Sequence, residues 1–151
     1  MKCFKRIICL LLVAAMFTVI PVHAAEDAVT AEATDARSSS YFWCSSVFLY
    51  KTSSTTFEAW FDVGAVNIMD ELGATVIKVQ RSDDGVNWDT MRTYRSTVYP
   101  GMICTNTAAH TYGVTYTSAT PGCYYRAYIV LYAKNANGFA EMYEYTSTLK
   151  M

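Results

Sequence analysis

From Tyr41 to the C-terminus, short runs of aromatic and β-branched residues alternate with tight-turn signals, and this alternation limits the possible folds more than any other feature. In the run 55–63, Phe57 and Phe61 share one face, while Glu58 and Asp62 share the other. Such a two-residue period is typical of a strand with one buried face. Tyrosine, tryptophan and threonine, in which this region is rich, also favour strands. Since no long helical pattern accompanies them, the sequence predicts an all-β fold.

The runs and the turns between them predict seven strands, at 41–50, 55–63, 75–81, 88–97, 111–117, 124–133 and 139–149. That number favours an antiparallel seven-stranded sandwich of two sheets. The stretch Val66–Leu72 lies between two of these strands, and its pattern is compatible with one helical turn on a connection.

The N-terminus has the features of a secretory signal peptide. Lys2, Lys5 and Arg6 precede an apolar run, and Val22-His23-Ala24 supplies small residues at the −3 and −1 positions of a cut before Ala25. We therefore predict a signal peptide at 1–24, a flexible acidic arm at 25–40 and a β-sandwich domain at 41–151. No later run approaches the roughly 20 apolar residues that a membrane span needs. The expected location of the mature chain is outside the cell.

The charge of the chain limits its partners. The leader contains three of the 12 basic residues and none of the 13 acidic ones, so nine basic residues face 13 acidic ones in the mature chain. Nucleic-acid binding usually needs a basic face, and anionic membranes also attract basic segments. We therefore expect neither nucleic acid nor a membrane surface as the partner.

Two segments carry a family resemblance. The run Pro121-Gly122-Cys123-Tyr124-Tyr125-Arg126-Ala127-Tyr128-Ile129, with Asn137-Gly138 after it, is similar to the sixth strand and last hairpin of fibronectin type III-like domains. The turn in 79–88 (VQRSDDGVNW) resembles the hairpin between that family's third and fourth strands. The resemblance implies an immunoglobulin/fibronectin type III-like sandwich. It also gives Tyr125 the structural role of the tyrosine corner, whose hydroxyl bonds to backbone. The chain departs from the family at Trp60, which the alternation places on the polar face.

The chain also resembles a domain-of-unknown-function family of small secreted proteins of Gram-positive bacteria. The shared features are the leader, the hairpin that ends in Trp88, the Tyr-Tyr-Arg strand and the ending Tyr145-Thr146-Ser147. This likeness implies secretion and the same fold, and it implies no activity.

Catalytic motifs are absent from the sequence. There is no Gly-x-Ser-x-Gly or His-Glu-x-x-His pattern, and His110 is the single histidine after the leader, in an expected polar loop. We therefore expect no enzyme, no metal site and no cofactor. Cys44, Cys104 and Cys123 remain after cleavage. If a disulfide forms, the expected strand order favours Cys44 with Cys104, and three free thiols are the alternative.

Outward aromatic residues are the remaining candidates for a function. Alternation along 124–133 buries Tyr125 and turns Arg126, Tyr128 and Tyr132 outward, and Tyr143 follows on the next strand. A row of tyrosines with an arginine suits a glycan or a protein partner, although such rings can also simply cover one another. We therefore predict a secreted non-catalytic binding module with ligand-binding residues Tyr128, Tyr132, Tyr143 and Arg126. A small secreted toxin or antimicrobial protein is the alternative.

Overall fold

A computed structural model describes residues 40–151. The predicted signal peptide 1–24, and the predicted arm 25–40 apart from Ser40, lie outside the described residues. The elements are β1 (Phe42–Lys51), β2 (Phe57–Ser82), β3 (Asp89–Arg95), the 3-10 turn η1 (Pro100–Met102), β4 (Ile103–Tyr116), β5 (Tyr124–Asn135), β6 (Gly138–Tyr145) and β7 (Leu149–Lys150). Every strand pairing is antiparallel, so the prediction of an antiparallel all-β fold is confirmed.

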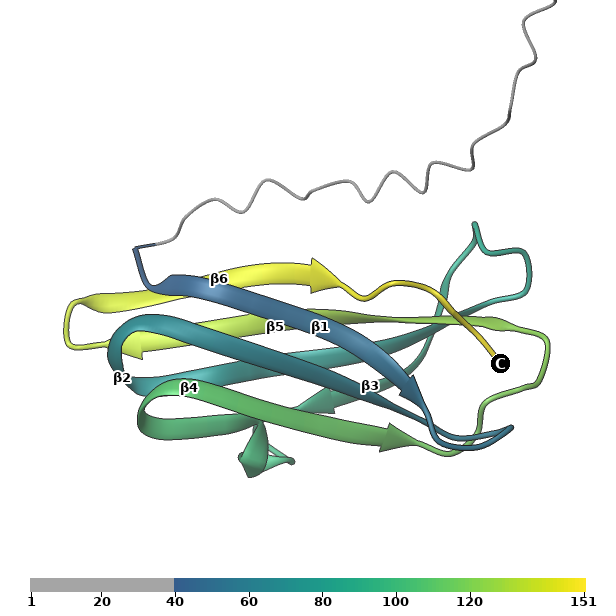
Figure 1. Cartoon of the computed structure of the whole chain (residues 1–151), viewed down its shortest axis with the longest axis horizontal. Helices are drawn as coiled ribbons and strands as arrows, with labels where there is room; N and C mark the ends of the chain where they lie inside the picture. The colour runs from purple at the N-terminus through teal and green to yellow at the C-terminus, as the bar shows by residue number, and fades with distance from the viewer. Residues whose placement is uncertain (1–39) are drawn as a thin grey trace, which may run out of the picture. The chain divides into compact units, whose positions relative to one another are not determined.

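The strands form one continuous sheet rather than two separate ones. Within residues 40–151 it contains seven strands, and its main path runs β1-β2-β5-β6. Strands β3 and β4 also pair with β2, and β7 pairs with β5. The long strand β2 therefore connects most of the molecule (Figure 1).

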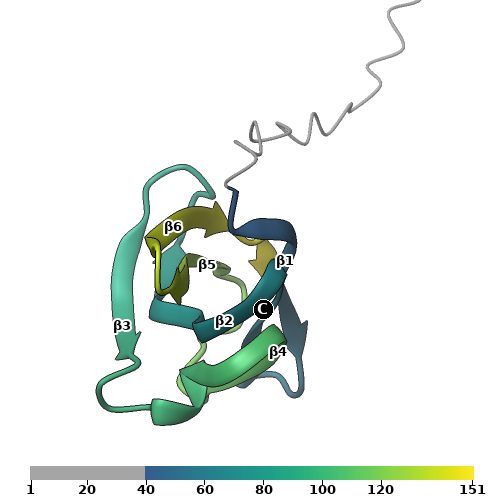
Figure 2. The same ribbon diagram turned by 90° about the vertical axis from the view of Figure 1, so that its left-hand side faces the viewer.

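Strand β2 serves so many partners because it bends. Its first half pairs with β1 and with β4 up to Gly64, and a register shift then follows before the ladder resumes at Met69. Its second half pairs with β5 and β3. The sheet consequently curls until its two halves face each other, as the end view shows (Figure 2).

The expected helical turn at Val66–Leu72 is wrong, and so is the expected break between the strands 55–63 and 75–81. Residues 64–74 all belong to β2, which continues without a break from Phe57 to Ser82. Met69 and Leu72 are buried, and the ladder pairs Met69 with Thr107 and Leu72 with Cys104. A helical turn would give up these backbone hydrogen bonds, which buried peptide groups need.

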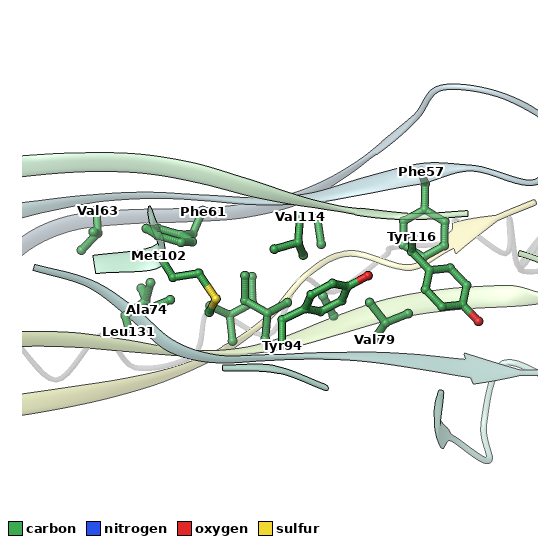
Figure 3. Packing of buried hydrophobic residues seen from close by; sticks show 14 of the residues in the cluster. Phe57, Phe61, Val63, Ala74, Val79, Tyr94, Met102, Val114, Tyr116 and Leu131 are labelled. Atoms are coloured by element: carbon green, nitrogen blue, oxygen red, sulfur yellow. The ribbon is translucent and has the colours of Figure 1, made fainter. Parts of the chain in front are cut away.

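The core lies between the two facing halves of the sheet. The first half of β2 contributes Phe57, Phe61 and Val63, and β4 adds Val114 beside them (Figure 3). The second half of β2 and β5 contribute the opposing side chains, including Val79 and Leu131 (Figure 3). Alternate residues of each strand thus fill a shared interior, and the other residues are left on the outside.

The chain's last expected strand, 139–149, is divided in two. Strand β6 ends at Tyr145, and Thr146 is buried beside β5. Its backbone N–H donates to the carbonyl of Ala127, and its hydroxyl accepts from the N–H of Ala127. This exchange leads the chain to β7, after which Met151 N–H donates to the carbonyl of Cys123. The C-terminal residues are thereby held on β5.

The curl brings the two ends of the sheet's main path together. Strands β1 and β6 lie side by side in both views (Figures 1 and 2), although no ladder joins them. The hydroxyl of Ser45 on β1 donates to the carboxylate of Glu144 on β6. A side-chain hydrogen bond therefore crosses the gap between these two edges.

Candidate functional site

The predicted ligand-binding residues lie on the outer side of β5 and β6. In β5 the residues Tyr125, Ala127, Ile129 and Leu131 are fully buried, so the alternate residues between them point outward. The ladder places Tyr128 opposite Tyr145 and Val130 opposite Tyr143. We call this outer patch the aromatic surface, and it consists of Trp88, Arg126, Tyr128, Tyr132, Phe139, Tyr143 and Tyr145.

Tyr128 lies at the centre of the aromatic surface. Its ring stacks on Tyr143 with centroids 6.3 Å apart and an interplanar angle of 14°. It also meets Tyr145 at 5.0 Å and 50°, and Lys78 Nζ from β2 lies 5.4 Å from its centroid. Such ring pairs and cation–π contacts each add to the energy of burial. Tyr128 and Tyr143, both predicted, are therefore in direct contact.

Arg126 is fixed from three directions. Its guanidinium lies 4.3 Å from the ring of Trp88 and 4.5 Å from the ring of Tyr145. Its Nε donates to the amide oxygen of Gln80 at 2.8 Å. The arginine is thus oriented before any ligand arrives, with other guanidinium donors still available.

Tyr132 belongs to the same surface but lies farther along β5. It packs on Phe139 of β6, with centroids 6.0 Å apart. The structure therefore places all four predicted residues on one face and divides them into two contact groups, with Arg126, Tyr128 and Tyr143 in the first and Tyr132 in the second.

The rings of β6 remain open to solvent despite these contacts. The exposed fractions are 66% for Phe139, 55% for Tyr143 and 54% for Tyr145, whereas Tyr128 and Tyr132 are half-buried. Partial burial raises the pKa of Tyr128 and Tyr132. The pKa of Tyr143 is also raised, chiefly because its hydroxyl donates to Glu141 at 2.7 Å. All three phenols therefore stay protonated at neutral pH and keep their hydrogen-bond donors.

Trp88, Phe139 and Tyr145 belong to this surface but were not among the predicted binding residues. The last two follow from the hairpin, because Asn135 pairs with Gly138 across the turn. Counting outward from that pair places Tyr145 opposite Tyr128 and Phe139 opposite Lys134. Trp88 could not be found in this way, since it reaches Arg126 from the segment before β3.

Tyr125, the predicted structural residue, is completely buried. The backbone N–H of Thr120 donates to its hydroxyl at 2.8 Å. Its ring packs on Phe57 with centroids 5.1 Å apart and on Tyr116 at 6.0 Å. The hydroxyl thus joins strand β5 to the connection that precedes it.

The Cys44–Cys104 disulfide is not formed, and Cys44, Cys104 and Cys123 are free thiols. Cys44 lies opposite Gly64 in the first half of β2, whereas Cys104 lies opposite Leu72, beyond the bend. The prediction assumed that the two cysteines meet at one end of a sandwich. The bend instead places them against different halves of β2. Cys123 donates to Asp83 at 3.2 Å, and this hydrogen bond raises the pKa of its thiol.

His110 is not in a loop, because β4 begins eight residues before the expected start of that strand and includes it. Its Nε2 lies 2.9 Å from the carbonyl oxygen of Gly101, and its ring meets Phe61. Within residues 40–151, no group of three or more histidine, cysteine or acidic side chains is arranged to hold a metal ion. The same residues contain no helix with the length and hydropathy of a membrane span.

Trp60 is the residue at which the chain departs from the fibronectin type III-like pattern. It lies on the outside of the half of the sheet that contains the first half of β2. Its Nε1 donates to the carboxylate of Glu58 at 2.8 Å. Its ring covers Gly113 of β4 so closely that a Cβ there would lie 2.5 Å from ring atoms. Trp60 thus faces away from the aromatic surface.

No family model matches the chain, and no curated protein matches it. Among solved structures, the chain is similar to the sporulation control protein Spo0M from Bacillus subtilis, with a TM-score of 0.40 and 11% sequence identity. The match covers 68% of this chain and 47% of that protein, so the chain spans about half of its length.

Proposed function

We propose that the chain is an exported, non-catalytic binding module whose aromatic surface contacts an extracellular glycan or protein. The observation that carries the proposal is the group of open rings around Tyr128, together with an arginine that two rings and Gln80 orient. Aromatic rings offer contact area at low entropic cost, and arginine adds directed hydrogen bonds. Since these groups stand on paired strands, little further ordering is needed on binding.

The first experiment identifies the ligand class. The chain from Ala25 to Met151, which contains all of residues 40–151 and hence the whole described core, is labelled and applied to a glycan array and to whole bacterial cells. Binding to defined sugars indicates a glycan ligand. Binding to cells that protease treatment abolishes indicates a protein. Absence of binding in both formats, at protein concentrations up to the millimolar range, would contradict the proposal.

The second experiment places the ligand on the surface. Tyr128→Ala should weaken binding at least tenfold, because truncating a central aromatic contact typically costs 1–2 kcal/mol or more. Trp60→Ala is the matched control, since Trp60 is an outward ring on the other half of the sheet. Melting temperatures of both variants show whether a loss of binding exceeds a loss of folding. Equal effects of the two substitutions on affinity would remove the aromatic surface from the proposal.

The proposal that the protein is exported rests on the N-terminal sequence alone. Intact-mass measurement of material from the culture medium should give a chain that begins at Ala25, or at Glu26 if the cut is shifted by one residue. A secreted species that retains the apolar run would contradict the predicted leader.

We also infer that the two facing halves of the curled sheet correspond to the two layers of an immunoglobulin/fibronectin type III-like sandwich. Strand β2 would then be shared between the layers. The buried side chains of both halves, which meet in one core, support this interpretation.

A further inference from the structure

A cleft of about 330 Å³ lies between β3 and β4, on a different side of the molecule from the aromatic surface. Arg92, Tyr94 and Tyr99 line it from the β3 side, and residues 112–115 of β4 line it from the other. Its volume is at the lower end of the range for ligand sites, about 300–1,000 Å³. The cleft therefore suits a short segment rather than a folded domain.

Strand β4 offers an unpaired edge to this cleft. Within residues 40–151, β2 is the only strand that pairs with β4. The hydroxyl of Tyr94 donates to the carbonyl of Thr115 at 2.7 Å, so this carbonyl points away from β2 and into the gap. In an antiparallel ladder the backbone groups of every second residue point the same way. Gly113, two residues earlier, therefore presents its N–H and C=O to the cleft.

Arg92 supplies a positive charge at the same place. It lies opposite Val79, whose side chain is buried, so Arg92 projects from the inner face of the edge strand β3. Its guanidinium lies 4.9 Å from the ring of Tyr94, and one of its nitrogens donates to the hydroxyl of Tyr99 at 3.3 Å. No ion pair joins Arg92 to a carboxylate of residues 40–151. The described part of the chain thus positions this cation without an acidic partner.

We propose that this cleft binds a short extended peptide segment, whose carboxylate pairs with Arg92 and whose main chain hydrogen-bonds to Gly113. We infer a carboxylate in the ligand because its charge complements that of Arg92 and because arginine can donate two parallel N–H hydrogen bonds to such a group. The free edge selects an extended main chain, which adds to a sheet as a further strand. The hydroxyl of Tyr94 already donates to the carbonyl of Thr115. The main-chain hydrogen bonds between the peptide and β4 therefore begin at Gly113. The carboxylate comes either from a peptide C-terminus or from an acidic side chain.

The test uses acetylated tetrapeptide pools, in which the neutral positions are randomised among Ala, Val, Thr and Tyr. One pool ends in a free carboxylate, and a second is amidated and carries Glu at its third position. A third, amidated pool is wholly neutral, and a fourth carries Lys in place of Glu. The protein is the chain from Ala25 to Met151, labelled with ¹⁵N only at its seven glycines. Gly113 reports on the cleft, and Gly138 at the start of β6 is the internal control.

The Gly113 amide signal should shift in a saturable way with a carboxylate pool, while the Gly138 signal stays in place. A response to the first pool alone assigns a C-terminus, and a response to the second alone assigns an acidic side chain. Arg92→Gln should weaken binding about tenfold or more, because it removes a charged hydrogen-bond donor. Arg95→Gln, on the same exposed strand but outside the cleft, should change the affinity less than twofold.

Tyr99→Phe serves as a second variant, should Arg92→Gln lower the melting temperature. It removes only the hydroxyl that accepts from Arg92 and should weaken binding two- to fivefold. The proposal is overturned if Gly113 does not shift with either carboxylate pool, if the neutral or lysine pool binds equally well, or if folded Arg92→Gln binds like the parent. Arg92 would then only protect an edge strand from pairing, as inward-pointing charges do. Tyr128→Ala should leave this binding intact, so the outcome is independent of the aromatic surface.

Discussion

Replacing Tyr125 by Phe removes one buried oxygen atom near the start of β5 and leaves the ring in place. The contacts with Phe57 and Tyr116 depend on the ring, so the substitution keeps them. What is lost is the hydrogen bond from the N–H of Thr120. Thr120 is exposed as a residue, so a small movement of the connection can turn the freed N–H group toward water. The cost should therefore lie near the lower end for a lost hydrogen bond, at about 1 kcal/mol.

Urea denaturation followed by tryptophan fluorescence measures this cost directly. A loss of about 1 kcal/mol should lower the urea midpoint without a change in slope, and should lower the melting temperature by about 4 °C for a domain of this size. Tyr124→Phe is the matched control at the neighbouring position. Its ring is half-buried beneath Lys150, and the structure records no hydrogen bond from its hydroxyl to any of residues 40–151. That variant should lose less than about 0.5 kcal/mol.

Two results would refute the reasoning. If both substitutions lower the free energy of unfolding equally, the hydroxyl of Tyr125 stabilises the fold no more than the hydroxyl of Tyr124 does. If Tyr124→Phe costs more, the hydrogen bond that matters is on the outer side of β5. A change in the urea slope of Tyr125→Phe would instead mean that the substitution alters how much of the chain unfolds cooperatively.

The other predictions concern the turn before β3 and the outer face of β4. The carboxylate of Asp84 accepts from the N–H groups of Asn87 and Val86, and these bonds hold its pKa well below the ordinary value of 3.8. Its contribution to stability is therefore complete above about pH 5 and is lost as the pH falls below about 4, so Asp84→Asn should flatten the acid side of a plot of stability against pH. Gly113→Ala should cost about 1–3 kcal/mol, because the new Cβ would collide with the ring of Trp60. In urea melts that cost should largely vanish in the Trp60→Ala background, and its persistence there would show a backbone origin.

The outer face of β5 could be predicted from the sequence because it depends on local rules. Alternation along one strand decides which side chains are buried, and that rule placed Tyr125 inside and Tyr128 outside. The two-residue turn Ala136-Asn137, closed by the pair Asn135 and Gly138, fixes the register of the hairpin, because a short turn leaves only one pairing of the two strands. Local pattern therefore places Tyr128 and Tyr143 on one outer face of neighbouring strands, whereas the approach of Trp88 to Arg126 depends on a segment distant in sequence.

The bend in β2 could not be predicted in the same way. The residues around it, such as Val66 and Ile68, are exposed although they are apolar, so the alternation appears broken in the sequence. Their strand conformation is supported by the hydrogen bond from the N–H of Val66 to the carbonyl of Tyr41 and by the ladders on both sides of them. The partners in β4 and β5 come from segments 30 or more residues away. Pairing with distant segments thus makes Val66–Leu72 part of a strand, although the local sequence pattern was compatible with a helical turn. The misplaced pair Cys44 and Cys104 followed from the same missing information.

The two open sides of the curled sheet differ in the side chains that cross them. One side joins β1 to β6, where Ser45 and Glu144 reach across and bring the edges together. The other side lies between β3 and β4, where tyrosine side chains line the cleft. Tyr94 there spans to Thr115 and packs edge-on against Tyr99 at 5.2 Å. A side-chain hydrogen bond thus links the edges β1 and β6, whereas on the other side Tyr94 crosses from β3 and the edge of β4 has no strand partner within residues 40–151. The aromatic surface and the cleft are therefore separate consequences of one strand that takes part in both halves of the sheet.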